Sequence, residues 1–221
     1  MMPKVIIYNS VSVDGAIKDF EVDVQLHYAV AGEIGADALL AGSNTAKTGI
    51  ELLMKTIPPE ESSDFLKPKI EHDDSRPFWV IADSRGVLKG LLHVHRKSGY
   101  SKDIILLVSN HTSKDYLDYL KERNYDYIVA GTEHVDYRLA LEELSKRYGI
   151  KTVITDTGGV LASILLERGF VDEVQLLISP EIVGKKAVNL FRSLNQPVKL
   201  QLTGNKIVGK NQALSIYKVQ K

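Results

Sequence analysis

Apolar and polar positions along the chain form blocks that predict strands and helices in turn. Dense apolar runs rich in β-branched and aromatic residues predict buried strands over residues 4–12, 36–42, 77–86, 103–110, 125–131 and 151–156. Apolar residues recur at helical spacing in the segments between, which predicts helices over 24–34, 43–55, 113–124 and 136–150. The helix over 43–55 begins with Ser, Asn and Thr, which are all favourable N-cap residues. A further helix and a second apolar run follow the glycine pair at 158–159.

The pattern changes in two segments. Residues 56–76 are polar, charged and proline-containing, which predicts an irregular surface segment. Residues 198–220 alternate between apolar and polar, with a turn signal at residues 210–212, and this predicts a terminal antiparallel hairpin. We therefore expect an α/β fold with a mostly parallel mixed sheet flanked by helices and an antiparallel edge. The length of 221 residues fits a single domain over residues 1–221.

Composition narrows the function classes. The chain has 28 basic and 28 acidic residues, so its overall charge does not favour nucleic acid or a membrane surface as a partner. Cysteine is absent from the sequence, which excludes disulfides, thiolate zinc sites, iron–sulfur clusters and the zinc deaminase signature. Apolar runs are too short for a signal peptide or a membrane span. We expect a cytoplasmic protein.

Candidate chemistry follows three predicted strands at their carboxyl ends, where α/β sheets place their ligands. The segments are AGSNT (41–45), ADSRG (82–86) and TDTGGV (155–160). Each offers small residues and backbone N–H groups, and each alone is equally typical of an ordinary turn. Together they favour a crevice for a phosphate or a dinucleotide. The sequence contains neither a Rossmann fingerprint nor a P-loop.

Two aspartates and two histidines leave alternatives open. Asp14 is either a ligand contact or general acid, or a turn residue that caps Gly15. Asp156 either binds a ligand hydroxyl or amine, or caps the helix that follows. His93 and His95 have the spacing of one strand face, but no third ligand accompanies them. We therefore predict a solvated loop there and no metal site.

Four segments carry a resemblance to a known family: SVDG (12–15), DALLAGSNT (37–45), RPFWVIADSRG (76–86) and residues 156–184, from DTGGV to SPEIVG. In this order they resemble the reductases of riboflavin biosynthesis, which act on 2,5-diamino-6-ribosylamino-pyrimidinone 5′-phosphate. The same family includes the reductase half of the bifunctional deaminase-reductases. The resemblance covers nearly the whole chain. It implies a dihydrofolate-reductase-like fold, NADPH as cofactor, a small phosphorylated pyrimidine as substrate and a homodimer.

The resemblance also implies roles for individual residues. Asp14 matches the nicotinamide and substrate region, and we predict it as the proton donor, with an ordered water as the alternative. Asp156 stands where the family has a substrate-binding glutamate, and Leu53 matches a substrate contact. The predicted cofactor contacts are Thr45, Ser84, Gly158, Gly159, Val160, Leu161, Ala162, Ser163 and Ile164. Valine at Gly159 is expected to block NADPH while leaving the fold intact.

The sequence departs from the family between Thr45 and Thr56. The family pattern there contains an aspartate, a proline and an arginine that helps to hold the substrate phosphate. Here Gly49 and Thr56 stand at the aspartate and the arginine, and Lys47 or Lys55 would supply the positive charge. The leading hypothesis is an NADPH-dependent reduction of ribosylamino to ribitylamino. The alternatives are the same fold acting on another pterin-like or small imine or carbonyl substrate, and a non-catalytic nucleotide-binding domain.

Overall fold

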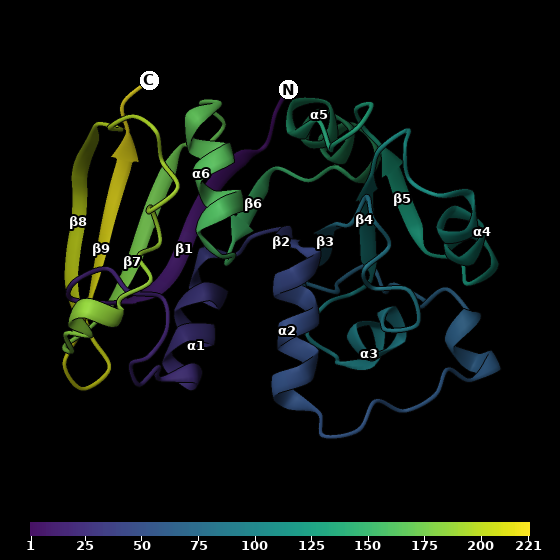
Figure 1. The fold of residues 1–221 in the computed structure, drawn as a ribbon, viewed down its shortest axis with the longest axis horizontal. Helices are drawn as coiled ribbons and strands as arrows, with labels where there is room; N and C mark the ends of the chain where they lie inside the picture. Colours follow the sequence, from purple (N-terminus) through teal and green to yellow (C-terminus); the bar gives the residue numbers. More distant parts are fainter. The chain divides into compact units, whose positions relative to one another are not determined.

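The computed structural model describes all 221 residues, with the side chain of Leu53 left outside the description. The chain divides into two compact units (Figure 1). Unit 1 comprises Met1–Pro3 and Asp37–Lys151, and unit 2 comprises Lys4–Ala36 and Thr152–Lys221. The Asp37–Lys151 segment of unit 1 thus lies between the two segments of unit 2 in the sequence. The expectation of one domain over residues 1–221 stays a prediction.

Unit 2 is built on a mixed sheet with the order β6-β1-β7-β9-β8. The central strand β1 (Lys4–Ser12) runs parallel to β6 (Thr152–Thr155) and to β7 (Glu173–Ser179). The hairpin of β8 (Leu200–Val208) and β9 (Gln212–Val219) adds to β7 in the antiparallel sense. Because β1 and β6 are parallel, their carboxyl ends lie at the same edge of the sheet, which is where a ligand site is expected.

Local sequence explains the helices of unit 2. Helix α1 (Val24–Ile34) begins where the Asp23 side chain accepts the N–H of Leu26 at 2.9 Å. It ends at Gly35, whose φ of 62° is the left-handed conformation that glycine adopts readily. Helix α6 (Gly159–Glu167) follows the glycine pair and buries Leu161, Leu165 and Leu166. A short 3₁₀ helix covers Gly184–Lys186.

Unit 1 holds a parallel sheet with the order β5-β4-β3-β2. Its strands are β2 (Ala38–Gly42), β3 (Phe78–Ala82), β4 (Ile104–Val108) and β5 (Asp126–Val129). The helices are α2 (Ser43–Leu53), α3 (Leu92–Lys97), α4 (Lys114–Glu122) and α5 (Tyr137–Tyr148), with a 3₁₀ turn at Ser62–Phe65. Tyr116 and Leu120 of α4 are buried in its core with Ile104 and Leu106 of β4.

The α/β class, the parallel strands and the terminal hairpin are confirmed, and the helix over 24–34 has the predicted bounds. Two local predictions are wrong. Helix α2 has Gly42 as its N-cap, without a side-chain hydrogen bond, although Ser, Asn and Thr were available. Residues 92–97 form helix α3, which the periodicity did not predict because it is only six residues long. Of the helices that the structure describes, none has the length and apolar content that a membrane span requires.

Candidate functional site

Asp156 follows β6 directly, and its carboxylate is held at both oxygens. Asn9 Nδ2 donates to Oδ1 at 2.9 Å, and His27 Nε2 lies 3.0 Å from Oδ2. The same Asn9 amide lies 3.3 Å from the carbonyl oxygen of Thr157. The side chain of Asp156 nevertheless stays 33% exposed. Because a carboxylate has about four acceptor positions, Asp156 is oriented by the protein and can still accept a bond from a ligand.

His27 joins Asp156 to strand β1. Its side chain is only 9% exposed, and its Nδ1 lies 2.8 Å from the hydroxyl oxygen of Ser10. The ring sits 4.8 Å from the ring of Tyr8 and meets Tyr28 edge-on at 5.2 Å. The Tyr8 hydroxyl donates to the His27 carbonyl at 2.9 Å. Burial, and then the charge of Asp156, raises the pKa of Tyr8 well above its ordinary value, so Tyr8 remains a hydrogen-bond donor.

The two glycines before α6 differ in what surrounds them. Gly158 is the N-cap of α6 with φ −62° and ψ 166°, a conformation open to any residue. A Cβ built on Gly158 would meet nothing within 4 Å, and no side chain caps the helix there. A Cβ on Gly159 would overlap the backbone carbonyl of Leu190. The expectation that valine at Gly159 leaves the fold intact is therefore wrong, because Gly159 is needed for packing within unit 2.

The rest of the predicted cofactor run enters the core. Val160 is 64% exposed, whereas Leu161, Ala162 and Ser163 are buried and Ile164 is half-buried. Only the first turn of α6 therefore presents backbone N–H groups to a ligand. In the described part of the chain, β1, β6 and α6 each hold one buried polar atom without a hydrogen-bond partner. These atoms are Asn9 Oδ1, Thr155 Oγ1 and Ser163 Oγ.

Asp14 is engaged with its own loop. Its carboxylate accepts the Ser12 hydroxyl at 2.6 Å and the backbone N–H groups of Gly184 at 2.8 Å and Val183 at 3.2 Å. The bonds from Ser12, Gly184 and Val183 lower the pKa of Asp14 to about 2. A carboxyl group with that pKa is ionised near neutral pH. The geometry thus favours an anchor for residues 183–184, and the proton-donor role of Asp14 stays a prediction.

The remaining predicted residues belong to unit 1. Thr45 and Lys47 lie exposed on α2, and Lys47 Nζ is 3.8 Å from Glu51. Lys55 is exposed after the end of that helix. Ser84 is half-buried in the turn after β3, and its carbonyl accepts the hydroxyl of Thr112 at 2.9 Å. The side chain of Leu53 lies outside the description.

The prediction of a solvated loop at His93 and His95 is wrong. Both lie on helix α3 and are buried, at 1% and 4% exposure. His93 Nε2 donates to the carbonyl of Pro58 at 2.8 Å. Burial lowers the pKa of His95 to about 4, and its ring packs edge-on against Trp79 with centroids 4.0 Å apart. Over the residues described, no group of three or more ligating side chains is placed to hold a metal ion.

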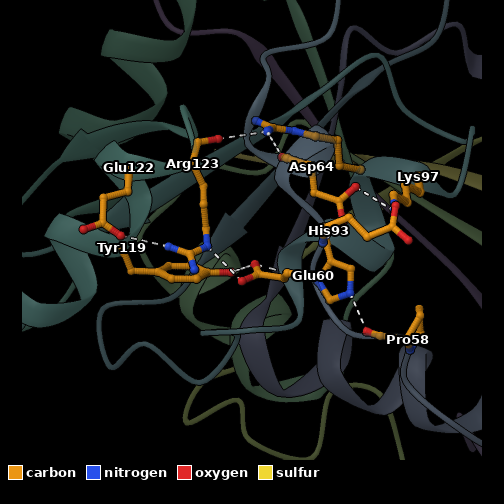
Figure 2. Close-up of polar contacts among 10 residues, drawn as sticks. Pro58, Glu60, Asp64, His93, Lys97, Tyr119, Glu122 and Arg123 are labelled. Carbon is orange, nitrogen blue, oxygen red and sulfur yellow. Dashed lines mark hydrogen bonds and ion pairs between the residues drawn. The ribbon is translucent and has the colours of Figure 1, made fainter.

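Figure 2 shows His93 within a polar network of unit 1. The Glu60 carboxylate accepts the Tyr119 hydroxyl at 2.6 Å and Arg123 Nε at 2.8 Å. A second ion pair joins Lys97 to Asp64 at 2.6 Å. These bonds fasten the predicted irregular segment, residues 56–76, to α3 and α4. The network therefore has a structural explanation.

Three residues of the candidate site were missed in the sequence: Asn9, Ser10 and His27. The adjacent polar pair Asn9 and Ser10 inside a buried apolar strand was the available signal, because buried polar side chains need partners. His27 had no local signal, since its partner Asp156 lies 129 positions away.

The comparisons with known proteins agree with one another. A model of the family described as the RibD C-terminal domain matches residues 3–213. A 2,5-diamino-6-ribosylamino-4(3H)-pyrimidinone 5′-phosphate reductase of Aquifex aeolicus is 31% identical over 112 residues, covering 48% of this chain and 50% of that protein. A reductase of the same name from Archaeoglobus fulgidus is 26% identical over 188 residues, covering 83% of each. The first of these alignments thus spans half the length of the relative.

Two solved structures share the fold. A pyrimidine reductase-like protein from Corynebacterium diphtheriae has a TM-score of 0.71 at 17% identity, covering 99% of this chain and 92% of its own. The riboflavin biosynthesis reductase Rib7 of Saccharomyces cerevisiae has a TM-score of 0.66 at 16% identity, covering 99% and 90%. At these identities the likeness establishes the fold alone.

Proposed function

The chain belongs to the RibD C-terminal domain family, and from this premise we propose that it is an NADPH-dependent reductase of riboflavin biosynthesis. It reduces the ribosylamino side chain of a diaminopyrimidinone 5′-phosphate to the ribitylamino form by hydride transfer. The names of the Aquifex and Archaeoglobus relatives support this substrate class. The observation that carries the proposal is the open helix N-terminus at Gly158 beside the oriented carboxylate of Asp156.

The start of α6 fits the phosphates of a dinucleotide. Neither the φ of Gly158 nor any neighbouring atom of the chain requires glycine there, so the absence of a side chain leaves space for a ligand. The first turn of α6 carries no acidic residue that would repel an anion. Backbone N–H groups of Gly159 and Val160 would hold the phosphates. When bound, NADPH supplies the hydride. Thr45 and Ser84 are proposed contacts from the family resemblance alone.

Asp156 is the proposed substrate contact. Asn9 and His27 fix the direction of its carboxylate, and its exposed third can accept a hydroxyl or an amine of the substrate. Lys47, Lys55 and Leu53 are proposed substrate contacts from the resemblance, with the two lysines acting toward the phosphate as point charges.

A second candidate is a reductase of the same fold that acts on another pterin-like or small imine or carbonyl substrate. The segment from Thr45 to Thr56 favours it, because the family arginine is missing there. The ammonium of Lys47 also lies 3.8 Å from the carboxylate of Glu51, which weakens the attraction of Lys47 for a phosphate. Comparing the phosphorylated substrate with its dephosphorylated form decides between the two. A preference for the phosphate supports the first candidate.

We also propose a homodimer in the cytoplasm. The dimer follows from the family resemblance, and light scattering of the purified protein measures it directly. The compartment follows from the proposed reactants, since NADPH and a sugar phosphate are charged and do not cross membranes unaided.

The proposed function is tested by following NADPH oxidation with the ribosylamino-pyrimidinone phosphate. We expect oxidation that requires the substrate and yields the ribitylamino product. Asp156→Asn should keep NADPH affinity and lose most turnover. The neutral amide has one oxygen that accepts hydrogen bonds, whereas the carboxylate has two. Substrate-independent oxidation, or no oxidation, would contradict the proposal.

A further inference from the structure

Ser10, His27 and Asp156 form a continuous hydrogen-bonded chain across the carboxyl ends of β1 and β6. The distances are 2.8 Å from the Ser10 oxygen to His27 Nδ1 and 3.0 Å from His27 Nε2 to Asp156 Oδ2. The two ends are accessible, since Ser10 is half-buried and Asp156 is one-third exposed, whereas His27 between them is buried. A buried imidazole thus links two groups that a ligand can reach.

The partners fix which nitrogen of His27 carries the permanent proton. An ionised Asp156 can only accept, so Nε2 must donate to it. Nδ1 is then the nitrogen that gains and loses a proton, and its partner is the Ser10 hydroxyl, which can both donate and accept. A carboxylate that fixes the tautomer of an imidazole next to a hydroxyl is the arrangement of an acid–base pair.

The reduction requires a proton besides the hydride, and Asp14 is held ionised by its own loop. We propose that Ser10 is the proton donor of the reduction and that His27, oriented by Asp156, replaces the proton that Ser10 gives up. This inference rests on the proposed function. His27 acts through Ser10 and is a positioning residue, whereas Ser10 is the group that meets the substrate.

Atoms and charges balance in this step. The carbon of the substrate C=N bond gains the hydride, and the π pair of that bond goes to nitrogen. Nitrogen takes the Ser10 hydroxyl proton while the Ser10 oxygen takes the Nδ1 proton of the His27 imidazolium. His27 ends as a neutral ring with its proton on Nε2, still donating to Asp156. After product release, water returns one proton to Nδ1 through Ser10.

In this step the imidazolium of His27 loses its charge, and the residues around it keep theirs. Tyr8 faces the ring from β1, and burial, Asp156 and Glu33 raise its pKa well above the ordinary value. Tyr28 meets the ring edge-on from α1. Glu33 lies further along the same helix. Asn9 is neutral and holds the far oxygen of Asp156. The proton that passes to Ser10 therefore comes from the imidazole of His27.

The test compares His27→Gln with the wild-type protein in substrate-dependent NADPH oxidation. Glutamine can still donate to Asp156, so the KM for substrate should change little, but its amide has no acidic proton to give to Ser10. We expect kcat to fall by about 100-fold, the usual size of general acid catalysis. His72→Gln, at an exposed position of unit 1, is the matched control and should behave as wild type.

Ser10→Ala and Ser10→Thr test the role of the Ser10 hydroxyl while leaving the His27 ring in place. Alanine should lower kcat by a similar factor and threonine should restore most of it, because only threonine keeps the hydroxyl. If His27→Gln melts at a lower temperature, this serine pair decides the question. An unchanged kcat in Ser10→Ala would overturn the proton transfer from His27 through Ser10 and leave the proposed function standing. A wild-type protein that never oxidises NADPH with substrate would overturn the proposed function and this proton transfer together.

Discussion

Replacing Gly158 with alanine adds a methyl group where the protein itself has nothing to meet it. The φ of −62° and ψ of 166° suit any residue, and the new Cβ has no neighbour within 4 Å. Folding stability should therefore hold or rise by about 0.4–1 kcal/mol, because alanine restricts the unfolded chain. If the first turn of α6 receives the cofactor phosphates, the methyl group stands in their way and removes hydrogen bonds to a charged group. Such bonds contribute about 1.5–3 kcal/mol each.

This loss corresponds to a Kd for NADPH about 10- to 100-fold weaker, at 1.4 kcal/mol for each factor of ten. Calorimetric titration measures the Kd, and a thermal melt measures stability. Gly159→Ala is the matched partner, since the same methyl one position later overlaps the carbonyl of Leu190. We expect it to cost about 1–3 kcal/mol of stability. In a protein of this size, the melting temperature then falls by about 2–12 °C.

The two alanines should thus separate: position 158 changes binding and position 159 changes stability. Unaltered NADPH affinity in Gly158→Ala would refute the argument that its missing side chain serves a ligand. A large loss of stability in the same variant would refute the geometry on which the argument rests.

The remaining predictions concern ionised groups. Asp14 has a folded pKa of about 2 against an ordinary 3.8, so the stability it contributes is complete above pH 3.8 and is lost as pH falls toward 2; urea unfolding of Asp14→Asn at pH 2 to 5 should lack this component, and an unchanged pH dependence would count against the anchor role. Glu60→Ala leaves Arg123 and Tyr119 without their shared carboxylate and should cost about 3 kcal/mol in urea unfolding. Lys69→Ala, which removes an exposed ion pair, should cost less than about 1 kcal/mol. Equal losses of stability in the two variants would contradict a larger contribution from the Glu60 network.

The sequence predicts those parts of the fold that local chemistry determines. Helix α1 has the predicted bounds because Asp23 and Gly35 supply a side-chain cap and a left-handed end. The terminal hairpin follows from the alternation of apolar and polar residues, and from the turn that closes it after Val208. The glycine pair at 158–159 lies at a strand-to-helix junction, as predicted.

What the sequence does not reveal depends on partners distant in the chain. Helix α3 is too short to show a period, and its histidines are buried by contacts with residues such as Pro58, 35 positions away. The bonds of Asp156 to Asn9 and His27 join residues 147 and 129 positions apart. Gly159 needs its missing side chain because Leu190 approaches it. No local pattern contains these contacts. The sequence therefore predicts both glycines as cofactor contacts and does not reveal that Gly159 is needed for packing.

The central claim is hydride transfer to the substrate, and isotope transfer tests it most directly. The purified protein is given the ribosylamino-pyrimidinone phosphate and NADPH carrying deuterium at the transferable position of its nicotinamide. The account predicts a ribitylamino product with deuterium at C1′, formed in proportion to the NADPH oxidised. A product without the label, or oxidation without product, would contradict it.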